Sequence, residues 1–276
     1  MSTQDIPASV DPRLPPELER QIFETAALNR PICVPSLALV ASRVREWIEP
    51  ILYRTLVINT RPIPGFPVCS VADFRSIVNT RSSAFLRAAV KTVIAVRVLS
   101  ADGKLMLRHF TGLETFYIIS YDALWPDHND EDTAFECPRL TRLYCDMTVL
   151  HRQAEDPPFA HPSLRGITHL EIFTHLFDTH EVHEWRALSA LPCLTHLALN
   201  DDLTVELRAY ILGGVCPALQ VFLLLVEPEP YPTQFVKSLA TDDVRFVVAT
   251  VSGFREGLFG VCVDGRGLLG QGREVY

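Results

Sequence analysis

The middle of the chain repeats one short pattern of hydrophobic and polar positions. Each copy reads apolar-x-x-apolar-x-apolar, and its last two apolar positions are two residues apart, which places both side chains on one face of a strand. Seven copies begin at Val90, Leu113, Leu140, Ile167, Leu194, Leu219 and Val244. Successive copies start 23, 27, 27, 27, 25 and 25 residues apart. Because no single copy can bury its apolar face alone, this period predicts short parallel strands that stack on one another.

The segments between the copies predict helices or loops that lead from one strand to the next. Residues 202–212 are expected to form a helix that ends at Gly213 and Gly214. Ser70 and Asp73 have the spacing of a capping box, which predicts the start of another helix. The remaining connections include one further helix candidate, 179–191, and two polar, proline-containing loops, 126–138 and 153–162.

Two short amphipathic helices are predicted before the repeats. The first starts at Pro15 and is stopped by Pro31, and the second starts at Ser36 and ends or kinks at Pro50. Apolar residues recur at spacings of three and four in both helices, so each has one apolar stripe. The stripe of the first helix comprises Leu18, Ile22 and Ala26, with Phe23 beside them. The stripe of the second comprises Leu37, Val40, Val44, Trp47 or Ile48, and Ile51. Two helices of this length bury too little apolar surface to form a stable unit on their own.

Composition narrows the class of protein. The chain has 276 residues, of which 48% are hydrophobic and 21% charged, so it can build a packed core. The net charge of −8 argues against a dedicated nucleic-acid binder, and no apolar run approaches the ~18 residues that cross a bilayer. Residues 1–10 lack the features of a secretory signal, and seven cysteines without framework spacing indicate reduced thiols. We therefore expect an intracellular protein, in the cytoplasm or nucleus, without a membrane or nucleic-acid partner.

Several motifs could in principle bind a metal or a cofactor, but each has a simpler interpretation. His180 and His183 are spaced to share a helix face and bind zinc, but exposed loop histidines are the preferred interpretation. A G-x-G-x-x-G pattern spans 265–270, yet too few residues follow it for the helix and strand of a dinucleotide site. Cys137 and Cys216 each stand before a proline, at the same turn position of the repeat. The sequence therefore predicts no catalytic residue, metal or cofactor.

One stretch is locally basic. Its cationic residues are Arg75, Arg81, Arg87, Lys91, Arg97, Lys104 and Arg108, and Asp102 is its one acidic residue. A solvated face is the preferred interpretation, and a partner-docking surface stays open because clustering in space cannot be read from the sequence.

The first part of the chain resembles an F-box. The segments that carry the resemblance are 14–18, 22–23, 37–40, 43–47 and 49–56. The repeats that follow have the period and core pattern typical of leucine-rich repeats, and residues 242–248 are similar to the end of such a repeat domain. Together these features resemble the F-box-like proteins common in mushroom-forming (basidiomycete) fungi, in which a short F-box leads into a degenerate leucine-rich-repeat region.

The resemblance implies a non-enzymatic substrate-recognition subunit of a Skp–cullin–F-box ubiquitin ligase. The N-terminal helices would bind a Skp-type adaptor, which links the protein to a cullin scaffold, and the repeats would bind a protein substrate. The adaptor-facing residues implied by the resemblance are Leu14, Pro15, Leu18, Ile22, Leu39, Val40 and Trp47. The strand positions expected to face the substrate are Glu114, Arg142, His169 and His196.

The expected fold is α/β, with an N-terminal helical F-box-like module followed by a leucine-rich-repeat-like solenoid of short parallel strands. The expected boundaries are a flexible lead-in at 1–12, the helical module at 13–58, the solenoid at 59–252 and a poorly ordered glycine-rich tail at 253–276. One alternative stays open: a repeat-based interaction scaffold that joins no ligase and whose N-terminal helices cap the solenoid.

Overall fold

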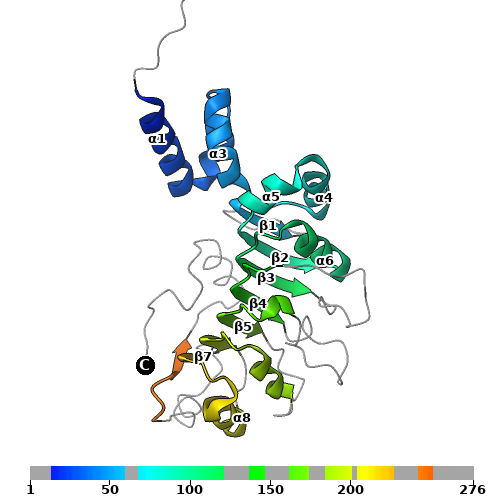
Figure 1. Ribbon diagram of the computed structural model, residues 1–276, viewed down its shortest axis with the longest axis vertical. Coiled ribbons are helices and arrows are strands. Elements are labelled where there is room, and N and C mark those ends of the chain that lie inside the picture. The colour runs from blue at the N-terminus through cyan, green and yellow to red at the C-terminus, as the bar shows by residue number, and fades with distance from the viewer. Residues whose placement is uncertain are drawn as a thin grey trace, which may run out of the picture. The chain divides into compact units, whose positions relative to one another are not determined.

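The computed structural model describes residues 14–59, 68–120, 137–146, 162–173, 184–200, 204–226 and 242–250. These residues belong to two compact units, which divide between Arg54 and Thr55 (Figure 1). The lead-in, the glycine-rich tail, the G-x-G-x-x-G pattern and the two proline-containing loops lie outside the described residues, apart from residues 137, 138 and 162 at the ends of the loops.

The first unit is helical, as predicted. It contains α1 Pro16–Asn29, the 3₁₀ turn η1 Pro31–Cys33, α2 Val34–Leu37 and α3 Ser42–Arg54. The second predicted helix is in fact two, because the chain turns between α2 and α3, so Ser36 lies inside α2 and is no N-cap. Pro50 was predicted to end or kink this helix, and it does not end it, since α3 runs one more turn to Arg54. Pro50 removes one backbone donor, and the burial of Ile48 with the packing of Ile51 holds the last turn in place.

A small core joins the three α-helices of the first unit. Its fully buried members are Ala27, Val34, Val44 and Ile48, with Phe23, Leu37, Trp47 and Ile51 packed around them. A fork of two hydrogen bonds reinforces this contact, because the Nε and Nη2 groups of Arg43 on α3 donate to the two carboxylate oxygens of Glu19 on α1 at 3.0 and 2.7 Å. The pKa of the Arg43 guanidinium is raised by this hydrogen bonding and by the charge of Glu19.

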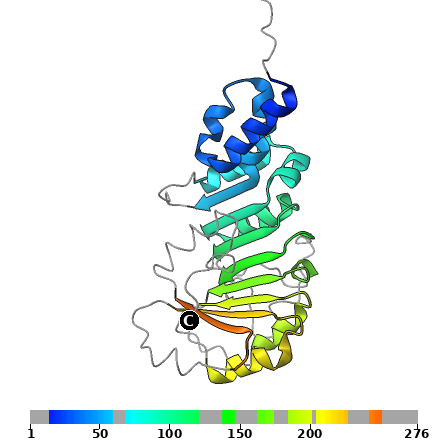
Figure 2. The same ribbon diagram turned by 90° about the vertical axis from the view of Figure 1, so that its left-hand side faces the viewer.

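The second unit is an eight-stranded parallel sheet whose strands follow one another in chain order (Figures 1 and 2). The strands are β1 Thr55–Asn59, β2 Thr92–Val98, β3 Thr115–Ser120, β4 Arg142–Asp146, β5 His169–Phe173, β6 His196–Leu199, β7 Val221–Val226 and β8 Phe246–Thr250. The predicted short parallel strands are thus confirmed. Residues 55–58, which the sequence assigned to the helical module, form most of β1.

The register pairs equivalent positions of successive repeats. The fourth residue of each repeat pattern lies beside that of the next, and all of them are buried: Val93, Phe116, Leu143, Leu170, Leu197 and Phe222. This row continues on one side to Leu56 of β1 and on the other to Phe246 of β8. The last repeat was therefore predicted one residue out of register, because Phe246 and not Val247 pairs with Phe222, and Val244 is 94% exposed.

Helices and turns connect the strands. They are α4 Val71–Thr80, α5 Ser83–Ala89, α6 Ser100–His109, the 3₁₀ turns η3 Pro162–Leu164 and η4 Glu184–Ala190, α8 Val205–Tyr210 and the π-helical turn η5 Ile211–Val215. Figure 1 shows α4, α5 and α6 along one side of the strands. The capping box is confirmed, since Ser70 caps α4 and exchanges hydrogen bonds with Asp73. The helix predicted near Leu207 is confirmed as α8, and Gly214 follows it with a φ of 110°, a conformation that glycine adopts at no steric cost.

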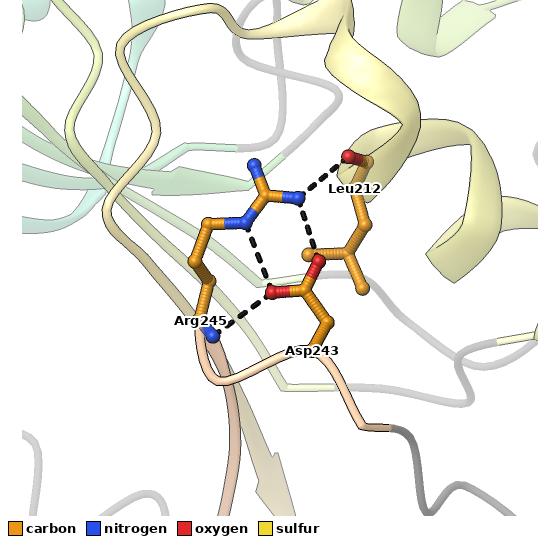
Figure 3. Close-up of polar contacts among 3 residues, drawn as sticks. All are labelled: Leu212, Asp243 and Arg245. Carbon is orange, nitrogen blue, oxygen red and sulfur yellow. Dashed lines mark hydrogen bonds and ion pairs between the residues drawn. The ribbon is translucent and has the colours of Figure 1, made fainter.

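A polar clamp holds the last strand against the preceding return segment (Figure 3). The guanidinium of Arg245 donates from Nε and Nη2 to the two carboxylate oxygens of Asp243, at 2.9 and 2.6 Å. Its Nη2 group also donates to the carbonyl oxygen of Leu212 in η5 at 2.7 Å. Arg245 therefore satisfies a carbonyl at the end of a helical turn and fixes the start of β8, where the ring of Phe246 packs edge-on against Phe222.

Candidate functional site

The first unit carries large apolar side chains on its outside. Leu39 is 87% exposed, Val40 62% and Ile22 55%, and Leu14, Pro15 and Leu18 are also exposed. We call these six residues the apolar helix surface. Trp47, the seventh adaptor-facing residue implied by the sequence, is half-buried and packs against the core of the first unit.

Helix α1 is apolar on two sides, which explains this surface. With 3.6 residues per turn, Phe23 and Ala27 lie on one side of α1 and pack in the core. Leu18 and Ile22 lie on another side and remain exposed. The sequence predicted a single stripe that held Leu18, Ile22 and Phe23 together, because periodicity identifies apolar positions without saying what covers them.

Three further large apolar residues of the first unit are exposed and were missed: Leu28, Ile32 and Leu52. Pro31 could have indicated the exposure of two of them. It predicts a tight turn at the end of α1, and Leu28 and Ile32 lie on either side of this turn, where there is little room for burial. Exposed apolar surface of this extent on so small a unit is typical of a protein-interaction site.

A second group of candidate residues lies on the sheet. Arg142, His169 and His196 pair directly in register on β4, β5 and β6, and we call them the polar row. The two imidazole rings stack with their centroids 4.3 Å apart and their planes only 4° from parallel. The structure thus brings together three of the four residues that the sequence placed on the substrate-facing surface.

Glu114, the fourth of these residues, occupies a different position. It precedes Thr115, which is the residue in register with Arg142, and its own repeat equivalent is Thr141. Its carboxylate lies 3.4 Å from the ammonium of Lys91. Glu114 therefore belongs to the turn that enters the strand and not to the polar row.

A ladder of threonine hydroxyls supports the polar row. The Oγ1 group of Thr168 donates to the carbonyl oxygen of Thr141 at 3.1 Å, and that of Thr195 donates to the carbonyl oxygen of Thr168 at 3.0 Å. Each hydroxyl oxygen also contacts the Nδ1 atom of the histidine that follows it, at 2.9 Å for His169 and 2.8 Å for His196. Assigning the one hydroxyl proton to the carbonyl places the imidazole proton on Nδ1, because the hydroxyl oxygen then accepts from the ring. The Nε2 atom of each histidine is then a hydrogen-bond acceptor.

The surroundings of both histidines lower their pKa values and so favour the neutral imidazole. Burial, the neighbouring His196 and the charge of Arg142 lower the pKa of His169 to about 4. Burial and Arg142 also lower the pKa of His196. The stacked geometry does not suit metal binding, because lone pairs of parallel rings do not converge on one ion. The arrangement instead presents two adjacent acceptors beside one cation.

The next row on the same sheet face is almost entirely apolar and contains one acid. Register aligns the eight side chains Val57, Ile94, Tyr117, Tyr144, Glu171, Ala198, Leu223 and Val247. Glu171 is 1% exposed, and neither carboxylate oxygen has a hydrogen-bond partner among the described residues. Burial raises the pKa of Glu171 to about 8, so the acid is mostly protonated at pH 7. Glu171 was not among the residues predicted from the sequence, because a polar residue in the middle of a strand normally indicates an exposed position.

The repeat-turn cysteines are confirmed as structural residues. Cys137 and Cys216 are both buried, and their carbonyl oxygens accept hydrogen bonds from the amides of Leu140 and Leu219. Burial raises the pKa of the Cys137 thiol to about 12 and that of Cys216 to about 11. Neither thiol therefore forms the thiolate that nucleophilic chemistry requires at neutral pH.

Among the described residues, no three histidine, cysteine or acidic side chains gather to hold a metal ion. His180 and His183 lie outside that part of the chain. None of the described helices is long and apolar enough to cross a membrane. The sequence matches no protein-family model, and no curated protein matches it either.

Proposed function

We propose that the protein is an F-box-like, non-enzymatic substrate-recognition subunit of a Skp–cullin–F-box ubiquitin ligase. The first unit docks on a Skp-type adaptor, and the eight-stranded sheet acts as a leucine-rich-repeat-like solenoid that holds a target protein. The proposal rests on the F-box resemblance of the first unit, and the apolar helix surface is the observation that carries it.

The chemistry of the first unit suits an adaptor interface. Its fully buried core has four members, whereas its large exposed apolar residues outnumber them: Leu14, Leu18, Ile22, Leu28, Ile32, Leu39, Val40 and Leu52. Burying apolar surface contributes roughly 25 cal/mol per Å², so a partner that covers these side chains gains most of its affinity from them. Helices that lay an apolar side into a partner's groove are a common mode of recognition.

The polar row supports the second half of the proposal. Its side chains are partly exposed, and they combine two acceptor nitrogens with one guanidinium on three adjacent strands. In stacked-repeat proteins the strand-lined face is the usual binding surface. Target recognition through Arg142, His169 and His196 therefore depends on hydrogen bonds more than on apolar burial.

Co-precipitation with a Skp-type adaptor tests the proposal. The full chain should capture the adaptor, and Leu14→Ala and Leu18→Ala should each weaken capture, because each removes apolar contact area without touching the core of the first unit. Leu99→Ala is a matched control, since Leu99 is exposed on the second unit. Failure of the wild-type chain to bind any adaptor would instead favour a repeat scaffold that joins no ligase.

A further inference from the structure

The turns that enter two strands form a pocket together with α5. The pocket has a volume of about 530 Å³. Its lining comes from α5, from the turn before β3 and from the turn before β4: Ala84, Arg87, Ala88, Thr111, Gly112, Pro138 and Arg139. The pocket thus belongs wholly to the second unit and is separate from both the apolar helix surface and the polar row.

The pocket has two guanidinium groups and no acid in its lining. The Nε group of Arg87 donates to the hydroxyl oxygen of Thr111 at 3.0 Å. Neither Arg87 nor Arg139 pairs with an acidic side chain among the described residues. Glu114, two residues after Gly112, is already paired with Lys91. Two like charges that share a pocket without an acidic neighbour favour the binding of an anion there.

The wall of the pocket depends on Gly112. A Cβ atom at this position would lie 1.9 Å from the carbonyl oxygen of Arg87, so the turn can approach α5 this closely only with glycine. This approach places the Thr111 hydroxyl beside Arg87. The hydroxyl oxygen accepts the Arg87 hydrogen bond, and its own proton stays available as a donor.

We propose that this pocket binds a phosphate-class oxyanion. Arg87 and Arg139 present forked donors that suit an anion with several oxygens, and the Thr111 hydroxyl supplies a further donor. The small side chains of Ala84 and Ala88 leave room for the group that carries the anion. The phosphate can come from a phosphorylated side chain of a bound protein or from a small phosphate ester. The site does not depend on adaptor binding, because none of its residues belongs to the first unit.

Calorimetric titration of the full chain tests the site at constant ionic strength. The probes are inorganic phosphate, a short phosphoserine peptide and the same peptide without phosphate. We expect saturable binding of the two phosphate-bearing probes and none of the unmodified peptide. The Arg139→Gln variant should weaken binding by about tenfold or more, because it removes one charge-assisted donor. Arg139 is exposed, so this variant should fold, which circular dichroism can check.

Arg165→Gln is the matched control, because Arg165 is an exposed arginine in the turn before β5, one repeat away. It should bind both probes like the wild type. Tighter binding of the phosphopeptide than of phosphate would support the proposal with a phosphorylated protein as the source, and equal affinities would support it with a small phosphate ester. The proposal is overturned if neither probe binds saturably, or if the two arginine variants weaken binding equally.

Discussion

The two units of the molecule use apolar residues in opposite ways. In the sheet, the fourth residue of each repeat lies beside its equivalents in the neighbouring strands, and these side chains are buried. In the helical unit, α1 buries Phe23 and Ala27 but leaves Leu18 and Ile22 exposed. Three return helices also begin with side-chain caps, because Ser70, Ser82 and Thr204 cap α4, α5 and α8, whereas α6 and α1 have no side-chain cap. The helical unit therefore exposes apolar side chains of a kind that the sheet buries in its repeat positions.

The largest effect should come from shortening a sheet core residue. Leu197 is fully buried between Leu170 and Phe222 in the register. The Leu197→Ala variant should lose about 2–5 kcal/mol of unfolding free energy, because it leaves a cavity between neighbouring strands. Leu39→Ala in the helical unit should change stability by less than about 0.5 kcal/mol, because Leu39 is exposed. Urea denaturation of both variants measures the difference, and equal losses would contradict the comparison.

The next effect concerns the single acid in the apolar row. Glu171 has a pKa of about 8 in the folded chain against an ordinary value of 4.5. Below pH 4.5 the acid is protonated in both the folded and the unfolded chain, so it places no electrostatic cost on folding there. As pH rises from 4.5 to 8, the unfolded chain releases this proton first, and the free energy of unfolding falls.

The Glu171→Gln variant should remove this dependence on pH. We expect its stability advantage over the wild type to grow between pH 5 and pH 8, to an order of a few kcal/mol. Glu46→Gln is the control, because Glu46 is exposed on α3. Thermal unfolding at a series of pH values measures both, and a pH-independent difference for Glu171→Gln would show that its carboxyl group is solvated.

The smallest of these effects should come from a helix cap of the second unit. Ser70 accepts a hydrogen bond from the amide of Asp73, and the Asp73 carboxylate accepts one from the amide of Ser70. Ser70→Ala should therefore cost about 1 kcal/mol. Thr25→Ala is the matching substitution in the helical unit, because Thr25 lies within α1 and far from any cap. It should change the free energy of unfolding little. Chemical denaturation distinguishes the two, and a larger loss for Thr25→Ala would reverse the expected order.

Much of the sheet could be predicted from the sequence, because the strand pattern recurs at nearly constant spacing. The first and last strands of the sheet were harder to predict. Residues 53–58 carry the same pattern, with Leu56 and Ile58 in the strand positions, but they follow a helix without a break and were assigned to it. At the other end, Phe246 and Val247 are both apolar, and the choice between them depends on how Phe246 packs against Phe222.

The candidate surfaces could be predicted only in part. The repeat phase placed Arg142, His169 and His196 at one position, and the structure has them adjacent. The stacking of the two histidines and the threonine ladder depend on the register between strands, which the sequence does not state. The pocket around Arg87 and Arg139 joins segments about 50 residues apart, so a basic run along the sequence could not reveal it.

Hydrogen–deuterium exchange of the full chain, with and without a Skp-type adaptor, tests the central claim most directly. We predict that the adaptor slows exchange of amides in α1 and in residues 38–40, next to the apolar helix surface, and leaves the strands β2 to β7 unchanged. Protection of the strands without protection of α1, or no protection anywhere at saturating adaptor, would contradict the assignment of the helical unit as the docking site.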